Sequence, residues 1–166
     1  MRLFLLLFLV GCAKAPPSST LSTEPIDFTL PTWPSKQNFS LASERGKVVM
    51  LDVWATWCEP CRESLPSYQS LATKHASRGL RLYALNVDGD AAVPEEIPKF
   101  ISETKLTLPI LLDVDAKLSE DLLKVKVMPT ALLIDRTGRV RYVHEGFEAR
   151  SLQEVEGHLE ALLSEP

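Results

Sequence analysis

The chain has 166 residues, of which 45% are apolar, 24% are charged and only seven are glycine, values typical of a single compact globular domain. Its formal net charge at pH 7 is −4, with 18 Lys and Arg against 22 Asp and Glu. The basic residues form no long cluster, so this balance disfavours a function in nucleic-acid binding.

The N-terminal residues differ in kind from the rest of the chain. Met1-Arg2 supplies one positive charge, and the eight residues 3–10 are all apolar. Such a run is too short to cross a bilayer, which takes about 20 residues in a helix, but it suits the apolar region of a signal peptide. The tetrapeptide Leu9-Val10-Gly11-Cys12 resembles the bacterial lipobox, in which the signal is cut before a cysteine that becomes lipid-modified. We therefore expect a signal peptide over residues 1–11 and lipid attachment at Cys12; the alternative is an ordinary cleavable signal, with Cys12 present by chance.

Residues 13–25 consist mainly of Ala, Lys, Pro, Ser, Thr and Glu, with almost no large apolar side chain. A segment of this composition cannot bury enough apolar surface to offset the entropy lost on ordering. We interpret residues 12–25 as a flexible tether and residues 26–166 as the folded domain.

Hydrophobic patterning after residue 25 predicts alternating strands and helices. The expected strands are 26–30, 38–41, 47–54, 80–87, 108–112, 130–134 and 139–144, the last two forming a hairpin. The expected helices are 58–77, 94–104, 116–123 and 151–163, the first kinked at Pro66. A turn is expected over residues 31–35. This order predicts an α/β fold, with a central mixed β-sheet flanked by helices.

The most informative motif is Trp57-Cys58-Glu59-Pro60-Cys61, between an apolar strand and a helix. A cysteine at a helix N-terminus meets unpaired backbone N–H groups and the positive end of the helix dipole, which stabilise a thiolate. Two intervening residues let the sulfurs close into a disulfide and reopen by exchange. A zinc site is the alternative, but it needs four ligands, and the chain has three cysteines and three scattered histidines. We expect no metal and no cofactor.

The motifs resemble the thioredoxin superfamily, and within it the exported, membrane-tethered thiol-disulfide oxidoreductases of the TlpA and ResA type. The matching segments are 51–61, Pro66, 85–88 and 127–138, within a resemblance that covers about residues 25–163. It implies a thioredoxin-like fold with an N-terminal extension and an inserted helix and strand between Asp90 and Asp113.

The resemblance also implies residue roles. Cys58 would be the exposed nucleophile, Cys61 the buried resolving thiol, and Pro129 a cis-proline that faces the dithiol. Asp52 would be a buried acid beneath them. Because it lies within an apolar strand, desolvation should raise its pKa and let it relay a proton for Cys61; the alternative is a solvated position at a strand edge. Two positions depart from the family pattern, since Ser64 stands where many relatives have Glu, and Ala84 where thioredoxins have a strand lysine.

The neighbours of the dithiol should have supporting roles. We expect Trp54 and Trp57 to pack and shield it. The charge of Glu59 should disfavour a thiolate and make the couple more reducing. The aromatic residues expected in the core are Tyr68, Phe100 and Phe147.

These observations favour a monomeric, lipid-anchored reductase that faces the extracytoplasmic space of a bacterium. Its expected partners are exported proteins with disulfides, apocytochrome c among them, and a membrane thiol reductant that recharges the dithiol. One alternative is a peroxiredoxin-like peroxidase, although Ala55 occupies the position where that motif needs Thr or Ser. Another is a lipid-anchored binding module that has kept the fold without the activity.

Overall fold

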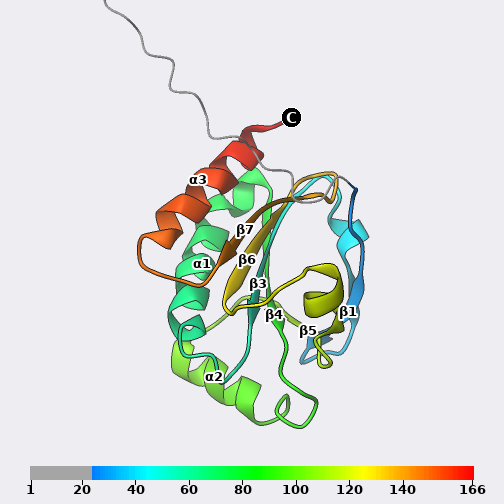
Figure 1. Cartoon of the computed structure of the whole chain (residues 1–166), viewed down its shortest axis with the longest axis vertical. Helices are drawn as coiled ribbons and strands as arrows, with labels where there is room; N and C mark the ends of the chain where they lie inside the picture. The colour runs from blue at the N-terminus through cyan, green and yellow to red at the C-terminus, as the bar shows by residue number, and fades with distance from the viewer. Residues whose placement is uncertain (1–23) are drawn as a thin grey trace, which may run out of the picture.

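The computed structural model describes residues 24–166, which form one mixed sheet of seven strands with helices against it (Figure 1). The predicted signal peptide, Cys12 and most of the predicted tether lie outside these residues. The strands are β1 (Thr29–Trp33), β2 (Asn38–Ser40), β3 (Val48–Trp54), β4 (Leu80–Asn86), β5 (Ile110–Leu112), β6 (Thr130–Ile134) and β7 (Val140–Glu145). The helices are α1 (Cys61–His75), α2 (Glu96–Thr104) and α3 (Ser151–Ser164), with short 3-10 turns at Leu41–Glu44 and Ala76–Arg78 and a π-helical turn at Leu118–Leu122.

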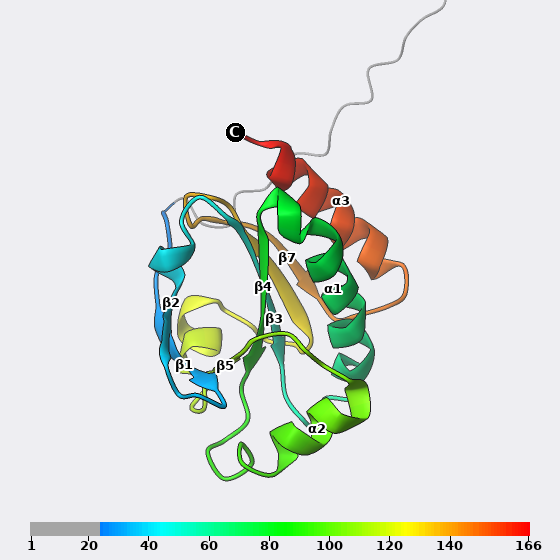
Figure 2. The same ribbon diagram turned by 180° about the vertical axis from the view of Figure 1, so that it is seen from behind.

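The sheet has the order β2-β1-β5-β4-β3-β6-β7. Its centre is parallel, with β3 beside β4 and β4 beside β5, whereas β6, β7, β1 and β2 pair antiparallel with their neighbours. The predicted α/β fold with a mixed sheet is confirmed. Helices α1 and α3 cover one face, while the β1–β2 hairpin and the π-helical turn lie over the other (Figures 1 and 2).

Strand β3 divides the core in two because its side chains alternate between the faces of the sheet. Met50 and Trp54 pack under α1, whereas Leu51 and Val53 pack on the opposite face. Asp52 belongs to the first set, so its carboxyl group points from the middle of the sheet toward α1. No helix among residues 24–166 has the length and apolar character needed to cross a membrane.

Some predicted boundaries are wrong. Strand β1 begins three residues late and includes the first three residues of the predicted turn, because its last residues pair with β5: Thr32 opposes Leu111 and Trp33 opposes Ile110. Helix α1 begins at Cys61 rather than Cys58, since Cys58 lies in the turn before it. The predicted helix over 116–123 is only the five-residue π-helical turn. The inserted segment between Asp90 and Asp113 forms α2 and β5.

Candidate active site

The two cysteines of the motif form a disulfide, Cys58–Cys61, at the junction of β3 and α1. Cys61 has no exposed surface, as predicted. Cys58 is 5% exposed, so the expectation of an openly exposed Cys58 is wrong for this oxidised state. It remains the more accessible of the two sulfur-bearing residues.

The backbone N–H groups at the start of α1 are already hydrogen-bonded, unlike the unpaired groups that the sequence suggested. The N–H groups of Cys61, Arg62 and Glu63 donate to the carbonyl oxygens of Cys58, Glu59 and Pro60 over 3.1 to 3.2 Å. The N–H groups expected to stabilise a Cys58 thiolate are therefore occupied within this turn. What the helix offers Cys58 here is the positive end of its dipole.

The carboxyl group of Asp52, in the strand that leads to the dithiol, is fully buried, as predicted. Its Oδ2 accepts a 3.1 Å hydrogen bond from Ser64 Oγ, while Oδ1 has no hydrogen-bond partner among the described residues. Burial raises the pKa of Asp52 to about 8, and the Ser64 hydrogen bond opposes that shift. Ser64 was noted only as a departure from the family pattern, yet it is the residue that contacts the buried acid.

The buried face of α1 continues from Ser64 to Tyr68, one helical turn further on. The Tyr68 hydroxyl is buried without a partner among the described residues, and its ring packs edge-on against Phe147 at 5.5 Å. Burial raises the pKa of Tyr68, and the charges of Asp52 and Tyr142 raise it further. Tyr68 and Asp52 thus form a polar region inside an otherwise apolar layer.

The two tryptophans near the motif differ. Trp54 is fully buried and packs against Phe100 with ring centroids 4.4 Å apart, which confirms its packing role. Trp57 is 72% exposed, so the expectation that it packs is wrong. It lies in the turn before Cys58.

Glu59, between the cysteines, is 87% exposed and lies 3.5 Å from Arg62. Arg62 also pairs with Glu103 at 2.7 Å and lies over the Phe100 ring at 5.0 Å. The guanidinium group partly offsets the charge of Glu59. Sequence reasoning weighed Glu59 alone and missed this cation, although the spacing of three residues on a helix start could have indicated it.

A second carboxylate holds the segment before the dithiol. Asp88 is buried just after β4, and its Oδ2 accepts from the backbone N–H of Thr56 at 2.9 Å and from Asn86 Nδ2 at 2.8 Å. Sequence reasoning placed Asp88 within the family-matching segment 85–88 and gave it no role of its own. Its contacts fix the loop that carries Trp57 and Cys58 against the end of the neighbouring strand.

A groove of about 540 Å³ adjoins the dithiol. It is lined by Pro60, by Met128 and Pro129, and by the end of β7 with the segment leading into α3. The Met128–Pro129 peptide bond is cis, as predicted, and the Pro129 carbonyl accepts from the Gly146 N–H at 2.7 Å. The structure therefore brings Cys58, Cys61, Pro60 and Pro129 together at one end of the sheet.

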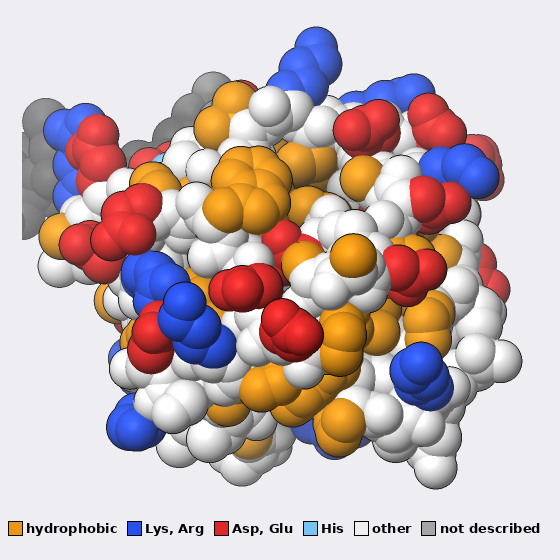
Figure 3. Space-filling view, turned by 90° about the horizontal axis from the view of Figure 1, so that it is seen from below, with side chains coloured by type: hydrophobic (Ala, Val, Ile, Leu, Met, Phe, Trp, Pro, Cys, Tyr) orange, Lys and Arg blue, Asp and Glu red, His pale blue; other side chains and the backbone are white. Residues whose placement is uncertain are grey.

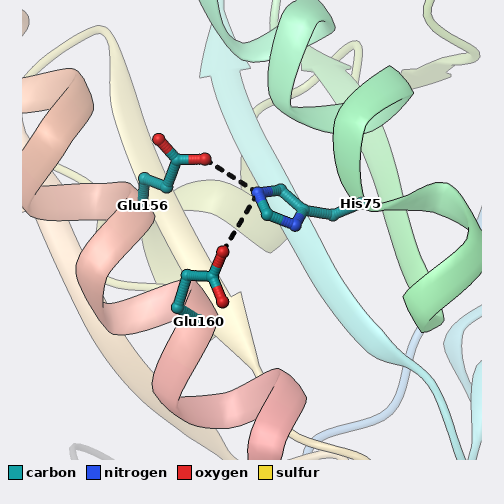
Figure 4. A group of neighbouring side chains, drawn as sticks. All are labelled: His75, Glu156 and Glu160. Atoms are coloured by element: carbon teal, nitrogen blue, oxygen red, sulfur yellow. Dashed lines mark hydrogen bonds and ion pairs between the residues drawn. The ribbon is translucent and has the colours of Figure 1, made fainter.

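Among the described residues, one cluster has the composition of a metal site, comprising His75, Glu156 and Glu160 (Figure 4). The ring of His75, on α1, points its Nε2 between the two carboxylates of α3, at 2.8 Å from Glu156 and 3.8 Å from Glu160. Lys74 already pairs with Glu156, and Arg78 with Glu160. The cluster is thus an ion-pair network that joins α1 to α3, at the opposite end of α1 from the dithiol.

Comparison with known proteins identifies the family. The sequence profile of the AhpC/TSA family matches residues 22–143, which include the dithiol, Asp52 and the cis-proline. The chain belongs to the AhpC/TSA family. Within this thioredoxin-like family, the predicted resemblance to the ResA type and the predicted thioredoxin-like fold are confirmed by the relatives that follow.

Two curated relatives carry the name thiol-disulfide oxidoreductase ResA. That of Oceanobacillus iheyensis is 35% identical over 72% of this chain and 59% of its own length, and that of Geobacillus kaustophilus is 33% identical over 74% and 67%. A crystal structure described as a putative thiol:disulfide interchange protein DsbE, from Chlorobium tepidum, is 33% identical with a TM-score of 0.75, covering 84% of this chain and 94% of that one. The chain thus matches about three fifths to two thirds of the two curated relatives' length.

Proposed function

We propose that this protein is a thiol-disulfide oxidoreductase that reduces disulfides of other proteins outside the cytoplasm. The observation that carries the proposal is the Cys58–Cys61 disulfide beside a cis-proline groove, together with the buried acid Asp52, whose hydrogen-bond partner Ser64 also lies 3.5 Å from the Cys61 carbonyl oxygen. The names of the ResA and DsbE relatives support the same reaction class.

In the proposed reaction, the reduced protein supplies two electrons. The Cys58 thiolate attacks one sulfur of the substrate disulfide, and the other substrate sulfur leaves as a thiolate that takes up a proton. Cys61 then loses its proton and attacks the Cys58 sulfur, which releases the second substrate thiol and closes the protein disulfide. Because the pKa of Asp52 is about 8, its carboxyl group exchanges protons near neutral pH and is suited to accept the Cys61 proton.

The charges around the sulfurs favour the reducing direction. Glu59 places a carboxylate between the two cysteines, which disfavours the thiolate and hence the reduced form of the protein. Arg62 weakens this effect, since its guanidinium lies 3.5 Å from the Glu59 carboxylate. The combined effect of the two charges on the reduction potential is therefore smaller than that of Glu59 alone. We infer a moderately reducing couple. We also propose that the reductase is a monomer.

We place this reductase on the outer side of a bacterial membrane. Residues 1–11 would be removed as a signal peptide, Cys12 would carry lipid, and residues 12–25 would tether the domain 26–166. Replacing Cys12 with Ser should move the protein from the membrane fraction to the soluble fraction and abolish lipoprotein processing, because acyl chains contribute about 0.8 kcal/mol per buried CH₂ to membrane binding. If the wild type and Cys12→Ser fractionate and migrate alike, the anchor is wrong.

The decisive test of the activity is to trap its substrates. In Cys61→Ser the first attack can occur but the release cannot, so mixed disulfides between Cys58 and exported proteins should accumulate in cells. The double variant Cys58→Ser, Cys61→Ser is the matched control and should trap nothing. Trapped apocytochrome c would place the protein in cytochrome c maturation, and a trapped membrane thiol protein would be its electron donor.

The same experiment separates the alternatives. A thiol peroxidase would consume hydroperoxide at a rate that depends on Cys58 and would trap no exported proteins in Cys61→Ser. A binding module without activity would keep its partners in the double variant. Either result would refute the proposed reductase.

A further inference from the structure

The groove beside the dithiol is lined in part by acidic side chains. Its carboxylates are Glu145, Glu148 and Glu154, all of them exposed. Arg150, also in the lining, pairs with Glu148 at 2.8 Å and neutralises it. Two carboxylates of the groove are therefore left without a compensating cation.

These two carboxylates are available to a partner. Glu145 makes no ion pair with the described part of the chain. Glu154 accepts a 2.9 Å hydrogen bond from the Tyr142 hydroxyl but likewise has no cationic partner there. Acidic side chains also lie around apolar surface on this end of the molecule (Figure 3). Glu59, next to Pro60 of the groove lining, adds a further exposed carboxylate.

Apolar surface accompanies this charge. Trp57 and Val127 are 72% and 47% exposed, and Val127 belongs to the groove lining with Met128. Large apolar side chains kept in water next to a groove indicate contact with a partner. Together with the acidic side chains they suit a polypeptide that brings both an apolar residue and positive charge close to its disulfide.

We propose that the groove selects disulfides flanked by Lys or Arg, so that the substrates of this protein are cationic polypeptide segments. This inference rests on the proposed reductase activity and adds the substrate class to it. Glu145 and Glu154 attract the positive residues, and Trp57 and Val127 contact apolar side chains near the disulfide. Because the carboxylates are at a solvated rim, they act mainly on the association rate, and salt weakens their effect.

Three synthetic peptides test the proposal. Each is closed by one disulfide and is identical apart from two flanking residues, which are both Lys, both Gln or both Glu. The fully reduced protein is mixed with each peptide for a single turnover, in which the protein dithiol becomes a disulfide and the peptide disulfide becomes two thiols. Each rate is divided by the rate with dithiothreitol, which corrects for the effect of the flanking charges on the disulfide itself.

At low ionic strength the Lys peptide should react about tenfold faster than the Glu peptide after this correction, and the difference should shrink at high salt. In Glu145→Gln, Glu154→Gln the preference should fall to about twofold or less. Glu160→Gln, a control in the ion-pair network far from the dithiol, should keep the wild-type preference.

The outcomes separate this proposal from the one on which it rests. Equal corrected rates for the three peptides, or a preference that survives in the groove variant, would refute charge selection while the reductase activity stands. If the folded, reduced protein oxidises with none of the peptides, the reductase activity itself fails.

Discussion

Replacing Asp52 with Asn should stabilise the protein, and by an amount that depends on pH. The pKa of this carboxyl is 3.8 when exposed and about 8 in the fold. Between these values the unfolded chain is ionised while the folded chain holds the proton, so folding takes up a proton and stability falls as pH rises. The fall is about 1.4 kcal/mol per pH unit, which amounts to about 4 kcal/mol between pH 4 and pH 7.

An amide in place of the carboxyl cannot ionise, so the stability of the variant does not fall with pH for this reason. Asn keeps the shape and can still bond to Ser64 Oγ, which limits other changes. We expect the free energies of unfolding of wild type and Asp52→Asn to be similar near pH 4 and to diverge up to pH 8, with the variant the more stable. Urea unfolding of the oxidised proteins across this range measures the difference without interference from the thiols.

The control is Asp115→Asn, the same change at an exposed carboxylate, which should follow the wild-type curve. If Asp52→Asn also runs parallel to wild type from pH 4 to pH 8, the pKa of Asp52 is not raised and its assignment as a proton acceptor near neutral pH fails.

Three further predictions concern the surface of the site. Alkylation of the reduced protein should label Cys58 well before Cys61, because of these two residues only Cys58 has any exposed surface; labelling of Cys61 first would reverse their roles. Glu59→Gln should make the potential less negative by less than about 30 mV, and Arg62→Gln should make it more negative, as measured by equilibration with glutathione; shifts of the same sign would exclude an electrostatic cause. Trp57→Ala should slow the reduction of protein disulfides severalfold while stability stays within about 0.5 kcal/mol, since the side chain is exposed; unchanged rates with protein substrates would rule out a docking role.

The strands that the sequence predicted best are those composed mainly of apolar residues, because such residues indicate burial. Val48–Trp54 is apolar except for Asp52, and Thr130–Ile134 is apolar after Thr130, as expected for central strands that are covered on both faces. Strand β1 was misplaced because pairing with β5, some 80 residues away, extends it past Pro31 into sequence that resembles a turn. The π-helical turn was overpredicted as a helix, since Asp113 anchors it from outside by accepting from the N–H groups of Leu118 and Ser119.

In the site, the sequence predicted the residues of the local motif and missed their long-range partners. The burial of Asp52 followed from its apolar neighbours in the strand. Its contact with Ser64 depends on how α1 lies over β3, and the contact of Asp88 with Thr56 depends on the pairing of β4 with β3. No sequence pattern indicates these two contacts, because each contact joins residues from different elements.

The place where the chain joins the domain sets which way the domain points. The Ile26 N–H donates to the Gly138 carbonyl at 2.9 Å, in the turn between β6 and β7, and the C-terminal end of α3 lies at this end too (Figure 1). The dithiol lies at the other end of β3, about 23 Å away for seven extended residues. A domain tethered through Cys12 would present its dithiol away from the bilayer, toward soluble partners. If the proposed electron donor is embedded in that bilayer, the domain would have to rotate to meet it, and the length of the tether would then affect the rate of recharging.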